Sequence, residues 1–277
     1  MNMKELRVRL GMTQKDLAEQ MATTQQTVAR WETGKTQLNV EQIKDLCLTL
    51  KCTVEELLGW KIDVEERRTS PFAIADAETR YGTLRIKTTV GSRQYPIDEK
   101  ARESILRQLK ELHNLRRNNT SRPWLYCWSL DNKILLINPQ YVRTIELIGD
   151  DVEEMPEYYH PEIYRALDDW DKGEVSGKLK KECDAIIAEM GDQEAVRMAS
   201  YVRVTYDDGE DEWNFLDEET ATTFFGLEAA TFDVPQCSFA EVEEEGYYRA
   251  RYANLDRVAV MEVPSDRYHR LTAPEEA

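Results

Sequence analysis

The sequence predicts an α+β protein, in which a small all-α domain of five helices precedes a duplicated α+β region with a helical connector. Three observations predict this fold. Residues that cap helices recur at short intervals over the first sixty residues. Two distant segments share a pattern of strand, glycine turn, strand and helix cap. The chain has 277 residues, enough for about two domains.

Helix signals follow one another closely at the start of the chain. The first helix carries Leu6 and Leu10 on one side. The other four helices each begin at a residue that can cap them, namely Thr13, Thr24, Asn39 and Thr53. Thr13 and Thr53 are each followed three residues later by an acidic residue, as in a capping box. Thr24 and the free N–H groups of its turn also suit a phosphate.

The third of these helices has two chemically different faces. At about 100° per residue, Val28 and Trp31 share the face that turns to the core. Gln26 and Arg30 then lie opposite the core, and Gln25 lies on the exposed first turn. Two glutamines alone would indicate only a solvated helix face. Glutamine, however, can pair with the edge of adenine and arginine with that of guanine, so this outer face has the chemistry to read bases.

The stretch "GMTQKDLAEQMATTQQTVARWETGKTQLNVEQIKDLCLTLKCTVEELLG" resembles the Cro/cI-type (XRE) helix-turn-helix family along its full length. Within it, "TTQQ…GKT" is especially similar to the recognition helix of a phage repressor of that family. The resemblance covers about 58 of the 277 residues. It implies an N-terminal domain over residues 1–60 that binds double-stranded DNA. Some domains of this family serve only as protein adaptors, which is the alternative for these residues.

The resemblance also implies a role for individual residues. It places Gln14 at the DNA backbone, Gln25 and Gln26 on the bases, Thr27 and Arg30 along the groove, and Lys35 near phosphate. Together with the capping residue, the DNA-binding set is Gln14, Thr24, Gln25, Gln26, Thr27, Arg30 and Lys35. Arg30 stands where the phage repressor has glutamine, so the operator of that repressor cannot simply be transferred to this chain.

The rest of the chain reads as a linker and two related halves. Polar and charged residues over 61–79 predict the linker. We expect a first α+β repeat over 80–150, a helical connector over 151–199 and a second α+β repeat over 200–277. Arg85, Gly91 and Tyr95 each lie 118 residues before a counterpart, Arg203, Gly209 and Trp213. The order β-β-α-β-β-β in both halves, rather than these few identities, is the stronger argument for duplication.

Charge divides the chain into a neutral start and an acidic remainder. Residues 1–60 contain eight basic and eight acidic side chains. The remaining residues contain 28 basic and 45 acidic ones, which is the whole net charge of −17. Only the neutral domain is therefore a plausible partner for DNA.

The sequence also predicts a cytoplasmic protein. It has five cysteines without a C-x-x-C pair, no apolar run that spans a bilayer and no signal-peptide core.

The sequence contains no sign of catalysis. It has no glycine-rich phosphate loop and no G-x-S-x-G motif. His113, His160 and His269 match no metal-ligand spacing, and we interpret each as a surface or linker histidine. Carboxylate runs such as "DDGEDE" are typical of solvated faces. We therefore expect no catalytic residues, no cofactor and no metal site.

One aromatic stripe stands out in the acidic region. Trp124, Tyr126 and Trp128 fall on one face of a predicted strand. Such a stripe is typical of a core or a subunit interface, and an effector pocket between the two repeats is the alternative.

These features together predict a sequence-specific transcriptional regulator, and we expect a repressor. One small domain covers only a few base pairs, so we expect a palindromic operator bound by a homodimer or higher homo-oligomer. The acidic C-terminal region would join the copies, and it is where a protein partner or a small effector would bind. The alternative is an antitoxin or phage-defence interaction module whose acidic body sequesters a basic partner protein.

Overall fold

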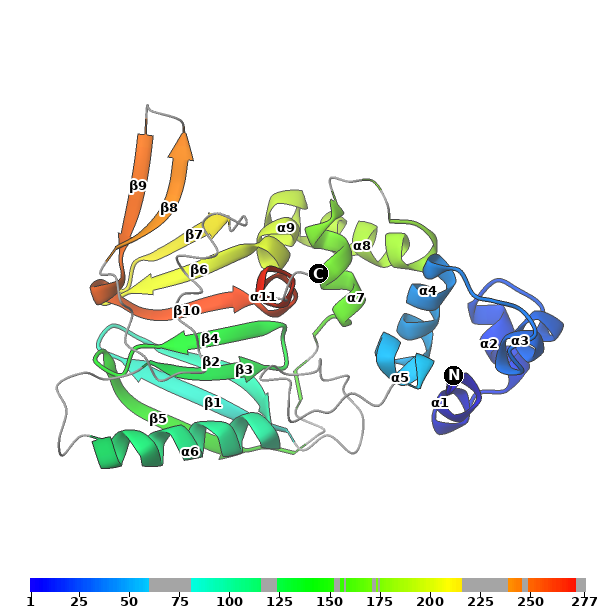
Figure 1. Cartoon of the computed structure of the whole chain (residues 1–277), viewed down its shortest axis with the longest axis horizontal. Coiled ribbons are helices and arrows are strands. Elements are labelled where there is room, and N and C mark those ends of the chain that lie inside the picture. The colour runs from blue at the N-terminus through cyan, green and yellow to red at the C-terminus, as the bar shows by residue number, and fades with distance from the viewer. Residues whose placement is uncertain are drawn as a thin grey trace. The chain divides into compact units, whose positions relative to one another are not determined.

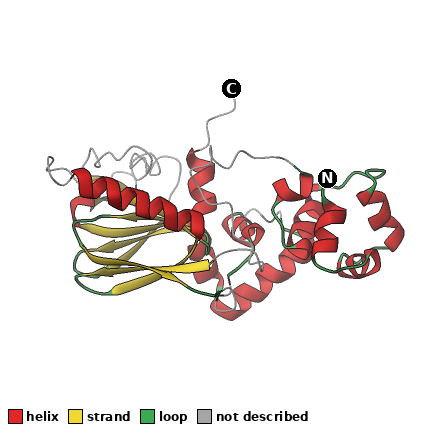
Figure 2. Cartoon of the chain, turned by 90° about the horizontal axis from the view of Figure 1, so that it is seen from below, coloured by secondary structure: helices red, strands yellow, loops and turns green. Residues whose placement is uncertain are grey.

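The computed structural model describes residues 1–59, 81–115, 124–151, 155–156, 158–170, 173, 175–215, 239–245 and 249–272. These residues form helices and antiparallel sheets, so the predicted α+β class is confirmed. The chain divides into two compact units. Unit 1 comprises Met1–Arg67 and Tyr159–Ala195, and unit 2 comprises Arg68–Tyr158 and Val196–Ala277. The described part of unit 1 is helical, and the strands lie in unit 2 (Figure 2). No helix among the described residues is long and apolar enough to cross a membrane.

Unit 1 begins with the five predicted helices (Figure 1). They are α1 (Met3–Arg9), α2 (Gln14–Gln20), α3 (Gln25–Glu32), α4 (Val40–Leu50) and α5 (Val54–Leu58). The four predicted caps are confirmed, because the side chains of Thr13, Thr24, Asn39 and Thr53 each accept a hydrogen bond from a backbone N–H of the helix that follows. Two further helices belong to the same unit, α7 (Pro161–Asp168) and α8 (Gly177–Met190).

A single apolar core holds the first five helices together. Its fully enclosed members come from all five helices and include Met3, Leu17, Val28, Trp31, Leu46, Leu50 and Leu57. Val28 and Trp31 are 0% and 3% exposed, as the helical spacing predicts. Burying side chains of this size stabilises a fold by about 1.5–3 kcal/mol each, and this term holds together helices too short to be stable alone.

The described strands of unit 2 form three antiparallel sheets. The first has the order β2-β1-β5, from β1 (Tyr81–Thr88), β2 (Ser92–Asp98) and β5 (Val142–Gly149). The second has the order β3-β4-β10-β6-β7, from β3 (Leu125–Ser129), β4 (Lys133–Ile137), β6 (Tyr201–Tyr206), β7 (Asp211–Phe215) and β10 (Val258–Pro264). The third is the pair β8 (Phe239–Glu245) and β9 (Arg249–Asn254).

Helices complete unit 2. Helix α6 (Glu99–Leu115) begins after Asp98, whose carboxylate caps it by accepting the N–H of Ala101 at 2.7 Å. The other elements are η4 (Leu255–Arg257), α11 (Ser265–Thr272) and the C-terminal part of α9 (Asp192–Ser200), a helix that begins in unit 1.

The five-stranded sheet is packed on both faces. On one face, Leu125, Leu135 and Val260 join the apolar side chains of β1, β2 and α6. On the other, Leu136 and Met261 join residues of β6 and of the segment after β9. The aromatic stripe belongs to this second core: Tyr126 is buried in it, and Trp124 and Trp128 pack against it partly buried. The interpretation of the stripe as core is therefore confirmed.

The two halves of unit 2 have the same strand order. In the first half the opening strand β1 lies between the second and last strands, in the order β2-β1-β5. In the second half β6 lies between β7 and β10 in the same way. A hairpin follows in each half, β3–β4 and β8–β9. The stretch where the second half would carry its helix, residues 216–238, lies outside the described residues, as do the predicted linker and the turn at Gly246.

Candidate nucleic-acid interface

Helices α2 and α3 are joined by a tight turn. Ala22 adopts a left-handed conformation with φ of 47°, which reverses the chain between the helices. The Thr24 hydroxyl then accepts the N–H of Thr27 at 3.2 Å and begins α3. The two threonine hydroxyls also lie 2.9 Å apart and share a hydrogen bond. The first turn of α3 is therefore fixed by two hydrogen bonds between the same two residues.

The outer face of α3 carries the predicted base-reading residues. Gln25, Gln26 and Arg30 are exposed, whereas Val28 and Trp31 are buried on the opposite face. This arrangement follows from the helical period alone. Gln25 and Gln26 lie in the N-terminal half of the second helix of the pair, the part that reaches base edges in helix-turn-helix proteins, and Arg30 lies in its last turn.

Lys35 follows α3 at the end of a short turn. Gly34 has φ of 68°, and the backbone N–H of Lys35 donates to the carbonyl of Arg30 at 2.9 Å. The side chain of Lys35 is exposed. A flexible cation at this place suits a phosphate, because it offers charge without a fixed geometry.

Gln14 has a partner that the sequence did not reveal. Its Nε2 donates to Oε2 of Glu32 at 2.8 Å, and Oε1 of Glu32 accepts from Nε of Arg7 at 2.7 Å. Burial raises the pKa of Glu32, but the hydrogen bonds from Arg7 and Gln14 outweigh this and lower the pKa below its ordinary value. Because an amide nitrogen carries two N–H groups, Gln14 retains one donor for DNA.

Helices α7 and α8 pack on α4. The Ser176 side chain makes no capping hydrogen bond, and the carboxylate of Asp45 on α4 instead accepts the N–H groups of Lys178 and Leu179 at 3.1 Å. Gly177 makes this approach possible, because a Cβ there would lie 2.5 Å from Oδ2 of Asp45. No local pattern in the sequence predicts this contact, which joins residues more than a hundred positions apart.

His160 is the N-terminal cap of α7. Its Nδ1 accepts the N–H of Glu162 at 3.2 Å, and its Nε2 lies 3.1 Å from the carbonyl oxygen of Cys52. Burial of the ring lowers the pKa of His160 to about 4, although the Cys52 carbonyl partly opposes this shift. Our interpretation of His160 as a surface or linker histidine was therefore wrong, because the ring is a half-buried contact within unit 1.

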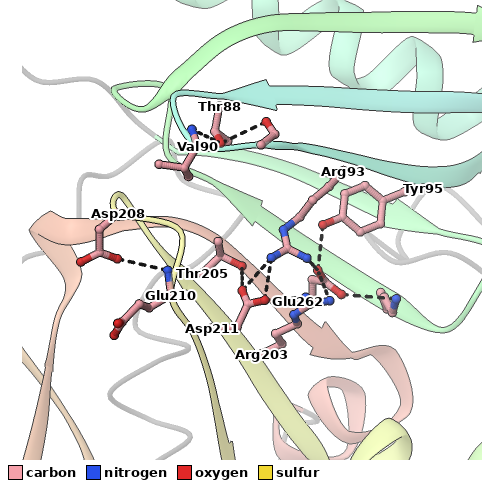
Figure 3. Close-up of polar contacts among 12 residues, drawn as sticks. Thr88, Val90, Arg93, Tyr95, Arg203, Thr205, Asp208, Glu210, Asp211 and Glu262 are labelled. Carbon is pink, nitrogen blue, oxygen red and sulfur yellow. Dashed lines mark hydrogen bonds and ion pairs between the residues drawn. The ribbon is translucent and has the colours of Figure 1, made fainter.

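Unit 2 contains a cluster of charged residues between its two larger sheets (Figure 3). The carboxylate of Glu262 is 4% exposed and accepts a hydrogen bond from the Tyr95 hydroxyl at 2.9 Å. Arg93 and Arg203 both donate to Asp211 at 2.6 Å, and each lies 3.6 Å from Glu262.

The charges of this cluster balance. Lys133 lies 3.0 Å from Asp131 and 3.3 Å from Glu262, so three cations face three carboxylates. Burial and the neighbouring Glu262 raise the pKa of the Tyr95 hydroxyl well above its ordinary value, which keeps it protonated as a donor. We assign the cluster to holding the sheets together. Within the described ranges, no group of three or more His, Cys, Asp or Glu side chains is arranged to hold a metal ion.

Comparison with known proteins identifies one part of the chain. Residues 3–57 match a family model described as helix-turn-helix. No curated protein and no solved structure matches the chain. The matched range covers α1 to α5 except the last residue of α5, and it contains every residue of the predicted DNA-binding set. The N-terminal domain is therefore an XRE-type helix-turn-helix, a domain of DNA-binding transcriptional regulators.

Proposed function

We propose that the chain is a sequence-specific transcriptional repressor that binds a palindromic operator as a dimer or higher oligomer. The observation that carries the proposal is the outer face of α3. Gln25, Gln26 and Arg30 are exposed there, and the buried Val28 and Trp31 hold the helix to the core from the other side. Glutamine and arginine are the side chains that pair bidentately with adenine and guanine in the major groove.

The remaining predicted residues have positioning roles in this proposal. Thr24 and Thr27 hold the first turn of α3, and Lys35 neutralises a phosphate beyond its end. Gln14 donates its second N–H to the DNA backbone from a position that Glu32 fixes. Contacts of this kind set the register of the protein on the duplex but carry no sequence information.

The acidic remainder of the chain supports the same function. The N-terminal domain over residues 1–60, which we call the head, is neutral, and the rest of the chain carries the net charge of −17. Repulsion from phosphates therefore favours approach through the head. A single head reads only a few base pairs, and two heads on half-sites about one helical turn apart would give useful affinity. We assign to unit 2 the task of joining the copies.

Single substitutions in the head test this function. An operator can be located by genomic footprinting of the tagged protein. Gln25→Ala and Gln26→Ala should each weaken operator binding by about 1–3 kcal/mol and relax the preference at particular base pairs. Lys35→Ala should weaken binding to the operator and to a scrambled duplex alike, and reduce the slope of log K against log salt by about one.

The comparison between the two kinds of variant decides the outcome. Circular dichroism establishes that each variant is folded. If the glutamine variants lose as much affinity for the scrambled duplex as for the operator, Gln25 and Gln26 do not read sequence. The head would then be an adaptor, and the antitoxin-like alternative would become the better account of the acidic region.

A further inference from the structure

The two halves of unit 2 are joined by a strand pair. Strand β4 of the first half pairs antiparallel with β10, the last strand of the second half. Leu135 lies opposite Glu262, and Leu136 lies opposite Met261. This pairing makes one five-stranded sheet from the β3–β4 hairpin of the first half and the strands β10, β6 and β7 of the second.

Strand β5 is the counterpart of β10 in the first half. Each is the last strand of its half and pairs with the first strand, β5 with β1 and β10 with β6. An arginine lies opposite a glutamate in both strand pairs. Arg85 of β1 lies opposite Glu146 of β5, and Arg203 of β6 lies opposite Glu262 of β10. Glu146 and Glu262 are 116 residues apart.

The β8–β9 hairpin is likewise the counterpart of the β3–β4 hairpin. It follows the second strand of its half and precedes the last, and β9 starts at Arg249, 116 residues after the start of β4 at Lys133. The spacing that relates β5 to β10 therefore also relates β4 to β9. The two strands that are joined in this chain, β4 and β10, have the counterparts β9 and β5.

These two counterparts each have an open edge among the described strands. Strand β9 pairs only with β8, and β5 is the end strand of its sheet. Burial reflects the difference: every residue of β10 is buried, whereas no residue of β5 is. Tyr252, in the middle of β9, is 55% exposed. An edge strand presents unpaired N–H and C=O groups and is a template for another chain.

We propose that β9 of one copy of the chain pairs antiparallel with β5 of a second copy, in the register that β4 and β10 use. Transferring that register places Arg251 opposite Glu146 and Tyr252 opposite Ile145. The first pair adds a contact between opposite charges that already form ion pairs within the chain, Arg251 with Glu212 and Glu146 with Arg85 and Lys87. The second joins an exposed aromatic ring to a half-buried aliphatic side chain. Both are favourable cross-strand combinations.

The pairing gives each copy two edges that take part in assembly. Each copy has one β9 edge and one β5 edge, so the contact is heterologous and builds either a closed ring or an open filament. The smallest ring contains two copies, with two seams between chains that repeat the β4–β10 seam within each chain. Such a dimer carries two heads, as a palindromic operator requires. The inference rests on strand order and does not depend on DNA binding.

Cysteine cross-linking of the full chain tests the register. In the double variant Ile145→Cys/Tyr252→Cys, the two thiols lie directly opposite each other across the seam, where Cα atoms of an antiparallel pair are about 4.5–5.5 Å apart and a disulfide can form. Strands β5 and β9 lie on opposite sides of unit 2, so the thiols of one copy cannot meet (Figure 1). We expect mild oxidation to give covalent dimers or discrete larger rings.

The matched control shifts one cysteine by one residue. In Thr144→Cys/Tyr252→Cys, the cysteine of β5 points to the other face of the strand, because successive side chains alternate. Cross-linking should fall at least about tenfold relative to the double variant with Ile145→Cys. Equal cross-linking of both pairs, or a wild-type chain that sediments as a monomer at tens of micromolar, would overturn the proposal. Circular dichroism of each variant separates loss of the seam from loss of the fold.

Discussion

Arg7 and Glu32 form an ion pair whose side chains are only 9% and 4% exposed. Removing one partner of a buried pair leaves the other charge uncompensated, which costs about 3–5 kcal/mol. We predict that Glu32→Ala lowers the free energy of unfolding of the head by this amount. Glu19→Ala is the matched control, because Glu19 and Lys15 are 68% and 74% exposed and such pairs contribute about 1 kcal/mol at most. Urea unfolding followed by circular dichroism measures both.

A second variant separates the ion pair from simple packing. Replacing Arg7 and Glu32 together by leucine removes both charges, so we expect a smaller loss than for Glu32→Ala alone. If the double variant is no more stable than the single one, the pair is not what makes Glu32 important.

His160 should make the stability of the chain depend on pH. Its pKa is about 4 in the folded chain against an ordinary value of 6.5, so between these values the unfolded chain binds the proton and the folded chain does not. Stability from this group is complete above about pH 6.5 and is lost as the pH falls towards 4. From about pH 7 to pH 5 the loss should be about 2 kcal/mol.

His160→Asn is the appropriate comparison for this prediction. Asparagine can cap α7 but does not titrate, so the variant should lack this part of the pH dependence. Carboxylates bind protons over the same pH range in the wild type and in the variant. Their effect therefore cancels when the free energies of unfolding of the two proteins are subtracted. Identical pH profiles of unfolding for the two proteins would show that His160 is not the titrating group.

At the scale of residues, the helical period was enough to predict which side chains of one helix are exposed and which are buried. The exposure of Gln25, Gln26 and Arg30 follows from the burial of their neighbours on the same helix. The Arg7–Glu32 pair and its link to Gln14 did not follow, because they depend on the approach of α1 to α3 across 25 residues. No local pattern distinguishes these charges from solvated ones.

At the scale of elements, local signals located helices and strands, but long-range pairing required the structure. Caps at Thr13, Asn39 and Thr53 are local, since each side chain bonds a backbone group three residues away. The pairing of β4 with β10 joins residues more than a hundred positions apart, and alternation of apolar residues says nothing about which strand is the neighbour. The predicted duplication gains support from the shared strand order and remains a prediction.

The docking of α8 onto α4 gives a prediction at the same scale. Gly177 and Gly173 have φ of 68° and 67°, so alanine at either position costs about 1–2 kcal/mol in backbone strain. At Gly177 the new Cβ would also displace the Asp45 carboxylate that caps α8, whereas at Gly173 nothing lies within 4 Å. Gly177→Ala should therefore destabilise unit 1 by about 1 kcal/mol more than Gly173→Ala, measured by urea unfolding. Equal losses would mean that Asp45 does not stabilise the contact.

At the scale of the whole molecule, our proposals assign assembly and DNA reading to separate units. Two linked heads bind two half-sites with a gain of about 100-fold or more over one head, without any new contact to DNA. A change that opens the proposed seam should therefore remove this gain and leave the affinity of each head unchanged. Substitutions in the head should have the opposite effect, because we expect Gln25→Ala to weaken binding to a single half-site as well.

The variant Tyr252→Lys tests whether the seam between copies gives the gain in affinity for the palindrome. Lysine in the middle of an edge strand opposes pairing with another chain, and the exposed ring of Tyr252 leaves the fold of unit 2 little affected by the change. We expect the variant to be monomeric, to bind a single half-site as the wild type does, and to lose about 100-fold or more on the palindrome. Leu106→Lys, on the partly exposed side of α6, is the control and should leave both affinities unchanged. A monomeric Tyr252→Lys variant that keeps full affinity for the palindrome would show that the operator is read without the assembly. If Tyr252→Lys instead assembles as the wild type does, the β9–β5 pairing is refuted, and the proposed base-reading role of α3 is not affected.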